Sequence, residues 1–170
     1  MLTTTLNRIK EYSPCHEGWK ELLGFLNKNK ADNDPLGFDV ILESNGLTDA
    51  VWCLQAEPNN IKEYRLFGIA CARDVQHLMV DERSIKAIDA VEMYAMGEIN
   101  ADELQQAYIA ACLVFDKTMS YEVEHASSVA RRVCGAGLYG SRIANNAYRF
   151  LTLGFEEVQK ERFIKMIESL

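Results

Sequence analysis

The stretch NIKEYRLFGIACARDVQHLM, residues 60–79, decides the fold class of this chain. It contains no proline and a single glycine, and apolar residues such as Leu66 and Ile69 recur at helical spacing. Asn60 stands three residues before Glu63, which is the spacing of a capping box at the start of a helix. The stretch therefore predicts a long amphipathic helix, reaching to Leu78, at the centre of the core.

Helix signals continue on the C-terminal side of this stretch. Asp81 is placed to cap a helix that Gly97 closes, and Asn100 with Glu103 repeats the capping box for the helix that follows. Two further helices are expected after these, over residues 121–133 and 156–168.

On the N-terminal side, a first helix is expected over residues 4–12. It must end there, because the residue before Pro14 is pushed out of the helical region. The helix after Pro14 has apolar residues at positions i, i+3, i+4 and i+7, which is the spacing of one buried face. These residues are Trp19, Leu22, Leu23 and Leu26.

Two helices are expected between this region and the central stretch. Asp34 can cap free amides and Pro35 suits the first helical position, so one helix is expected from there to Glu43, stopping at residues 44–46. The next is expected over residues 48–57, ending before a proline.

Length and composition agree with a single helical domain. A chain of 170 residues suits one hydrophobic core, and 48% hydrophobic with 25% charged residues is typical of globular proteins. Three prolines and ten glycines are too few for the many turns of a sandwich or barrel. We expect an all-α fold, a single-domain multi-helix bundle of antiparallel helical pairs over residues 1–170.

The sequence also bears on the compartment. No apolar run approaches the roughly 20 residues that span a bilayer, and the first ten residues lack the basic-then-apolar order of a secretion signal. We therefore expect no membrane contact and a cytoplasmic location. The five cysteines are widely spaced among alanine and leucine, so they are expected to be buried thiols in a reducing compartment.

Charge indicates the kind of partner. The net charge of −7, with cations scattered along the chain, argues against direct nucleic-acid binding, which needs clustered lysine and arginine. A protein partner or a small ligand fits an acidic surface better.

No catalytic or metal-binding constellation is complete in the sequence, and no cofactor is predicted. The segment Pro14 to Trp19 concentrates a thiol, an imidazole, a carboxylate and an indole, but adjacent side chains on a helix point in different directions. Arg73 and His77 are four residues apart and would share one helix face, either as a binding stripe or as a solvated surface. The binding candidates are charged or aromatic: His16, Trp19, Trp52, Arg65, Arg73 and His77.

Two other motifs are attributed to chance or packing. Glu122 and His125 have the Glu-x-x-His spacing of a di-metal carboxylate site, but the sequence holds one copy where two are needed. Gly135, Gly137 and Gly140 approach a dinucleotide-binding spacing, but that motif follows a strand, whereas the surroundings here are helical. Close helix packing accounts for these glycines.

Several stretches together resemble a known group of small helical proteins. The matching stretches are SPCHEGWKELL (13–23), NKADNDPL (29–36), ESNGLTDAVWCL (43–54), RLFGIACARDVQHLM (65–79), DERSIKAIDAVE (81–92) and YAMGE (94–98). The group is found in phages, prophages and bacterial genomes, and its members are described as hypothetical or immunity proteins. The resemblance covers residues 13–111, whereas residues 112–170 depart from the pattern. It implies an all-α fold and a non-enzymatic role.

The leading hypothesis is a non-catalytic protein-binding module, phage- or prophage-encoded, that inhibits or neutralises a toxin, nuclease or host-defence protein. Aromatic or arginine anchors such as Trp19, Trp52 and Arg73 would then be accessible at its surface.

Two alternatives remain open. One is a small-molecule or nucleotide-binding helical protein, or a weak hydrolase, in which His16, Arg73 and His77 gather in a pocket. The other is a homo-oligomeric structural protein whose last helix supplies a self-complementary interface through Phe163, Ile164 and Ile167.

Overall fold

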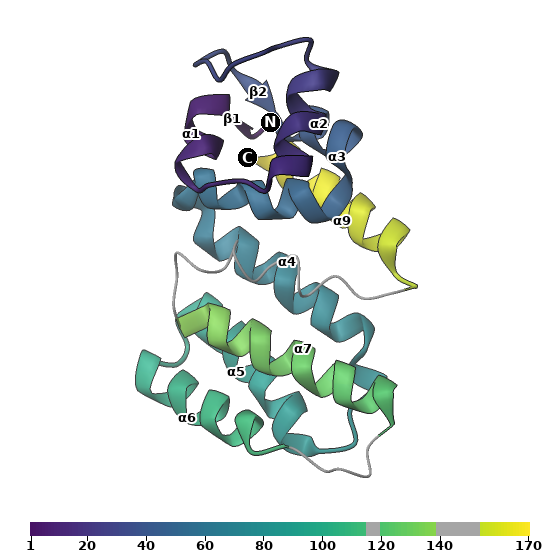
Figure 1. Ribbon diagram of the computed structural model, residues 1–170. Helices are drawn as coiled ribbons and strands as arrows, with labels where there is room; N and C mark the ends of the chain where they lie inside the picture. Colours follow the sequence, from purple (N-terminus) through teal and green to yellow (C-terminus); the bar gives the residue numbers. More distant parts are fainter. Residues whose placement is uncertain (115–119, 139–153) are drawn as a thin grey trace.

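Helix α4 (Ile61–Asp74) joins two groups of helices in the computed structural model, which describes residues 1–114, 120–138 and 154–170, with side chains omitted at 136–138 (Figure 1). One group contains the N-terminal helices and the other contains α5, α6 and α7. A continuous set of buried apolar side chains runs from Leu2 to Ile167 through both groups. The described chain is therefore a mostly helical domain, and the predicted all-α class is confirmed.

The N-terminal group is built from three helices and a minimal strand pair. Strands β1 and β2 pair antiparallel, with Thr3 opposite Gly37 and Thr4 opposite Leu36. The elements are β1 (Thr3–Thr4), α1 (Leu6–Glu11), α2 (His16–Phe25), β2 (Leu36–Gly37), α3 (Phe38–Cys53) and the 3-10 turns Leu54–Ala56 and Pro58–Asn60.

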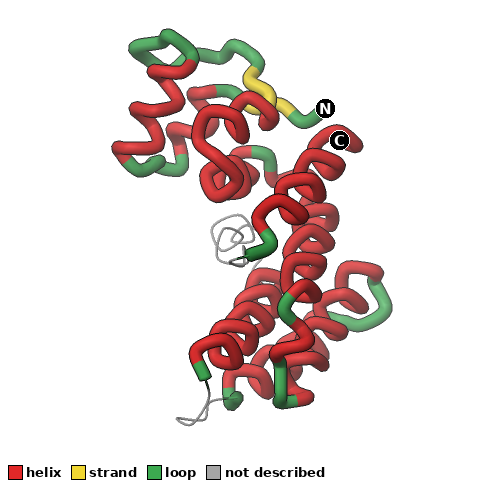
Figure 2. The backbone as a smooth tube through the Cα atoms, turned by 90° about the vertical axis from the view of Figure 1, so that its right-hand side faces the viewer, coloured by secondary structure: helices red, strands yellow, loops and turns green. Residues whose placement is uncertain are grey.

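The second group packs three helices against one another and against α4. Its elements are the 3-10 turn Gln76–Leu78, α5 (Glu82–Met96), α6 (Ala101–Cys112) and α7 (Tyr121–Leu138). The last helix, α9 (Glu156–Ser169), returns to pack on α3 and α4, and both ends of the chain meet where the Leu2 amide donates to the Ile167 carbonyl at 2.8 Å (Figure 2). None of the described helices is long and apolar enough to cross a bilayer.

Several predicted helix ends are confirmed. The Asp81 side chain accepts a hydrogen bond from the amide of Arg83, and Gly97 closes α5 in the left-handed conformation, with φ of 78°. Asn100 and Glu103 form both hydrogen bonds of the capping box that starts α6. These ends depend only on residues close together in sequence, which explains the agreement.

The predicted helix start at Asp34-Pro35 is wrong. Leu36 and Gly37 form strand β2, and α3 begins only at Phe38. Asp34 accepts a bond from the Lys28 ammonium at 2.8 Å and does not cap a helix. The cause is strand β1 at the N-terminus, which pairs with the backbone of Leu36 and Gly37. The same pairing places Thr4 in a strand, so the first helix begins after it.

Two other boundaries differ from the expectation, and one agrees with it. Asn60 precedes α4, but its side chain makes no capping bond, and the helix ends at Asp74, so His77 lies on a separate 3-10 turn. The expected break at residues 44–46 is confirmed, because Gly46 has non-helical values, φ of 78° and ψ of 179°, so that α3 consists of two helical segments joined at a kink. Helix α7 continues past Val133 to Leu138. The Tyr108 ring lies 3.0 Å from where a Cβ atom of Gly135 would be, so close packing of α6 and α7 accounts for this glycine.

The last helix is a core element. Phe163 and Ile167 are fully buried, and the Phe163 ring meets Phe67 of α4 edge to face at 5.8 Å between centroids. Arg162 fastens the helix further through two bonds to the Asp74 carboxylate, at 3.0 and 3.1 Å. The expectation that Phe163 and Ile167 form a self-association face is therefore wrong, because α3 and α4 already cover them.

The cysteines divide into two classes. Cys53, Cys71 and Cys134 are buried as expected, whereas Cys15 and Cys112 are exposed. Cys15 is exposed because it stands at the N-cap of α2, where its sulfur accepts a bond from the Gly18 amide at 3.4 Å. Burial of all five was thus an incorrect expectation.

A candidate binding cavity between α1, α2 and α3

A cavity of about 340 Å³ opens in the N-terminal group of helices. Its walls come from the end of α1, the first turns of α2 and the middle of α3. The lining residues are mostly apolar: Ile9, Ser13, Pro14, Cys15, Gly18, Trp19, Leu22, Ile41, Asn45, Thr48, Asp49, Trp52 and Cys53. The volume lies within the range of about 300–1,000 Å³ that is usual for ligand pockets.

Helix α2 approaches α3 closely at Gly18. A Cβ atom at this position would lie 2.5 Å from Oδ2 of Asp49, so no other residue fits without moving that carboxylate. The glycine therefore allows Trp19 of α2 and Asp49 of α3 to line the same cavity.

Helix α3 supplies the polar side of the cavity through its kink. Gly46 has φ and ψ values that are essentially restricted to glycine. The bend follows Asn45 directly, and the second half of α3 then presents Thr48, Asp49 and Trp52 to the cavity.

Asn45 holds the two helices together at this point. Its amide nitrogen donates to the Gly18 carbonyl at 2.8 Å and to Oδ2 of Asp49 at 3.0 Å. Its amide oxygen accepts from the Ser44 hydroxyl at 2.6 Å, which fixes the orientation of the amide. Asn45 is thus a positioning residue for the Asp49 carboxylate.

Asp49 gives the cavity its charge. No lysine or arginine lines the cavity, and within residues 1–114, 120–138 and 154–170 Asp49 forms no ion pair. Burial, and secondarily the negative charge of Asp49, raises the pKa of the neighbouring Cys53 thiol to about 12. The site is therefore apolar with one anionic group.

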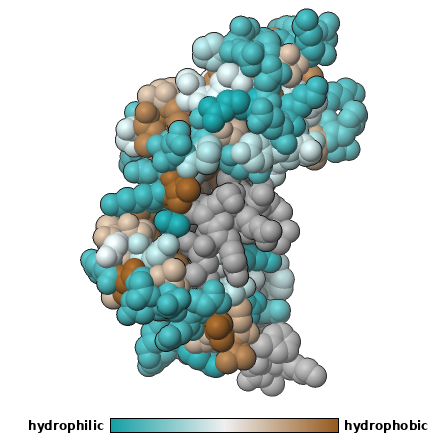
Figure 3. Space-filling view, turned by 90° about the vertical axis from the view of Figure 1, so that its left-hand side faces the viewer, coloured by the Kyte–Doolittle hydropathy of each residue, from teal (hydrophilic) through white to brown (hydrophobic). Residues whose placement is uncertain are grey.

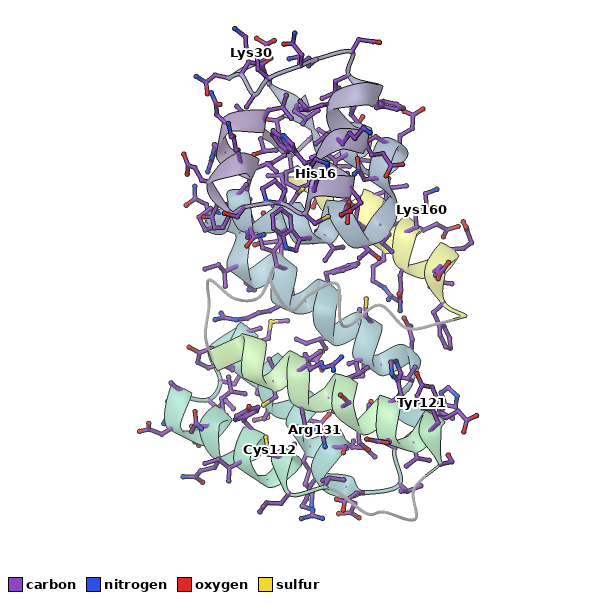
Figure 4. All side chains as sticks on the ribbon, in the orientation of Figure 1. His16, Lys30, Cys112, Tyr121, Arg131 and Lys160 are labelled. Carbon is purple, nitrogen blue, oxygen red and sulfur yellow. The ribbon has the colours of Figure 1, made fainter. Side chains whose placement is uncertain are left out.

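A second hollow of about 320 Å³ adjoins the first. It is lined by Asn45, Gly46, Leu47, Thr48, Glu156, Glu157 and Lys160 and shares Asn45 and Thr48 with the cavity. Lys160 projects from α9 on this side of the molecule (Figure 4). The two carboxylates at the start of α9 outnumber this one cation, so acidic character extends beyond Asp49.

The structure brings two of the six predicted binding residues together. Trp19 and Trp52 are both partly buried in the lining of the cavity. His16 is exposed at the start of α2 and is not among the lining residues (Figure 4).

The other predicted residues lie around α4. Arg73 binds Asp89 at 2.8 Å and Glu92 at 2.6 Å, which ties α4 to α5. Arg65 stacks over the Tyr94 ring, 4.9 Å from its centroid. Neither residue lines the cavity, and His77 is exposed beyond the helix end. The expected shared face of Arg73 and His77, and a pocket that gathers them with His16, are therefore not formed.

Sequence reasoning missed Asn45 and Asp49 as site residues. Residues 44–46 are expected to end one helix and residue 48 to begin the next, which agrees with the bend at Gly46 but does not indicate that Asn45 and Asp49 line a cavity. The stretches 13–23 and 43–54 together supply eleven of the thirteen lining residues.

The arrangement is suited to binding. Two indoles, several aliphatic side chains and one carboxylate can hold a group that is both apolar and cationic. Among the described residues, no group of three or more histidine, cysteine, aspartate or glutamate side chains could hold a metal ion. No known family model, curated protein or solved structure matches this chain.

Proposed function

We propose that this chain is a non-catalytic protein-binding module that inhibits or neutralises a toxin, nuclease or host-defence protein, encoded by a phage or prophage. The observation that carries the proposal is the cavity between α1, α2 and α3. It is built largely from two of the six stretches that carry the resemblance to immunity proteins, residues 13–23 and 43–54. A shared recognition site in that family would account for the resemblance.

The cavity has the composition of a protein-binding hot spot. Tryptophans are enriched among the residues that dominate binding energy, and here Trp19 and Trp52 are partly accessible in one recess. On the face drawn in Figure 3, hydrophobic residues gather only in small separate groups. The recess therefore offers a place where a partner side chain can be buried against two indoles.

Charge favours a basic partner. Between His16 and Cys53 the chain carries seven carboxylates against three lysines and no arginine. An excess of negative charge in the helices that form the recess speeds association with a positively charged protein and suppresses contact with acidic ones.

The test is affinity capture from host lysate with the full chain, after nuclease treatment, followed by mass spectrometry. We expect one protein in near-stoichiometric amount, and its loss with Trp52→Ala. Val80→Ala is the matched control, because Val80 is an apolar residue, 72% exposed, far from the cavity in sequence. If the unaltered chain captures no protein, the proposal is contradicted. If Trp52→Ala captures the partner equally well, the cavity is not the binding site.

The cavity volume supports a second candidate, a small-molecule or nucleotide-binding protein. About 340 Å³ is enough for a small ligand. Native mass spectrometry of the protein purified from its host would then show an added mass that denaturation releases. A bare protein mass together with a captured partner would reject this candidate.

A further inference from the structure

We infer that the cavity between α1, α2 and α3 receives an arginine side chain of the partner, whose guanidinium pairs with Asp49 and lies against Trp19 and Trp52. The inference rests on the proposed function and names the chemistry by which the partner is recognised. It applies to a basic protein partner.

The first step of the argument is the state of the Asp49 carboxylate. Asn45 donates to Oδ2 at 3.0 Å, and no other hydrogen bond to this carboxylate is formed within the described part of the chain. The Asp49 side chain is only partly buried and belongs to the lining of the cavity, so an incoming group can reach it. The cavity therefore presents a carboxylate that pairs with no cation among the described residues.

The second step concerns the kind of cation. Guanidinium is planar, is more weakly hydrated than ammonium, and stacks on aromatic faces while pairing with carboxylates. Trp19 and Trp52 supply indoles in the same cavity as Asp49. Aliphatic side chains such as Ile9 and Leu22 can contact the methylene stem of the incoming residue.

The third step is the surrounding field. Glu156 and Glu157 line the hollow that shares Asn45 and Thr48 with the cavity, against the single Lys160. Acidic groups beside the entrance attract a basic segment before its arginine enters.

The chain offers a direct readout, because its only two tryptophans are the two that line this cavity. Both indole N–H resonances of the full-length ¹⁵N-labelled protein would be followed by NMR and assigned with Trp19→Phe and Trp52→Phe. The probes are N-acetylarginine methylamide, its neutral citrulline analogue and the corresponding lysine derivative.

We expect the arginine probe to shift both resonances saturably, with a dissociation constant on the order of 1–10 mM. The citrulline analogue, tested on the same unaltered protein, should bind at least about tenfold more weakly because it lacks the charge. Asp49→Asn should weaken arginine binding by a similar factor. Glu43→Gln should leave it unchanged, because Glu43 is an exposed carboxylate of the same helix outside the cavity.

Four results would overturn the inference: no shift with the arginine probe, equal binding of citrulline, equal binding of lysine, or full binding by Asp49→Asn with an unaltered amide spectrum.

The proposed function and the arginine site can each fail without the other. A partner captured equally by the unaltered chain and by Asp49→Asn keeps the proposed function and removes the arginine site. Arginine binding without any captured protein keeps the guanidinium site and removes the proposed function.

Discussion

Cys15 and Cys112 are exposed, whereas Cys53, Cys71 and Cys134 are buried. Burial raises the pKa of each buried thiol to about 12, so the reactive thiolate is scarce as well as inaccessible. We expect a thiol reagent at neutral pH to modify two cysteines quickly and the other three only on unfolding. Mass spectrometry of the labelled peptides would identify them, and rapid labelling of Cys53 in the folded protein would contradict its burial.

The hydrogen bonds of the Asp81 carboxylate at the start of α5 should make the stability of the protein depend on pH. Hydrogen bonds from the Arg83 side chain, and then from its backbone amide, lower the pKa of Asp81 to about 2 from the usual 3.8. The resulting stabilisation is fully present above pH 3.8 and is lost as the pH falls through about 2. The melting temperature of Asp81→Asn should lie below that of the unaltered protein at pH 5, and the difference should shrink between pH 4 and 2. A difference that stays constant to pH 2 would contradict this assignment.

Helix α3 depends on the glycine at its kink. Gly46 lies at φ 78° and ψ 179°, where a β-carbon is strained, so Gly46→Ala should cost about 1–3 kcal/mol in the free energy of unfolding. A change in the kink should also weaken binding of the arginine probe, because the half of α3 that follows Gly46 supplies Asp49 and Trp52 to the cavity. Gly24→Ala is the matched control in α2, where nothing lies within 4 Å of the new methyl, and it should stabilise by about 0.5–1 kcal/mol. Chemical denaturation of both variants would test the pair, and equal effects would refute the role of the kink.

At the scale of elements, local signals were predictable and distant ones were not. The caps at Asp81, Gly97 and Asn100 involve neighbouring residues, and the structure confirms them. The start of α3 was misplaced because strand β1, more than thirty residues earlier, pairs with Leu36 and Gly37. No local pattern contains that information.

The candidate site was predictable by residue type but not by position. Trp19 and Trp52 stood out in the sequence as aromatic anchors, yet their convergence requires the close approach at Gly18 and the bend at Gly46. Both are properties of how α2 and α3 meet. Asp49 becomes a candidate binding residue only where α2 and α3 meet, since in the sequence it resembles an ordinary residue at a helix start.

At the scale of the whole molecule, α9 packs on α3 and α4 and meets the N-terminal segment at Leu2. Phe163 is fully buried against Phe67, so Phe163→Ala should cost about 3–5 kcal/mol in the free energy of unfolding. Val158→Ala is the control on the same helix, where the side chain is 50% exposed and the change should stay within about 0.5 kcal/mol. Denaturant unfolding would measure both, and a small effect of Phe163→Ala would mean that α9 is not part of the core.

The bond between Leu2 and Ile167 sets an order of events during synthesis. Ribosomes add about 5–20 residues per second, so α3 and α4 emerge on the order of 10 s before α9, which packs on them. Throughout this interval the surface that will receive α9 stays open on the nascent chain. Until α9 has left the exit tunnel, the nascent chain therefore exposes apolar surface of α3 and α4 that is buried in the folded protein.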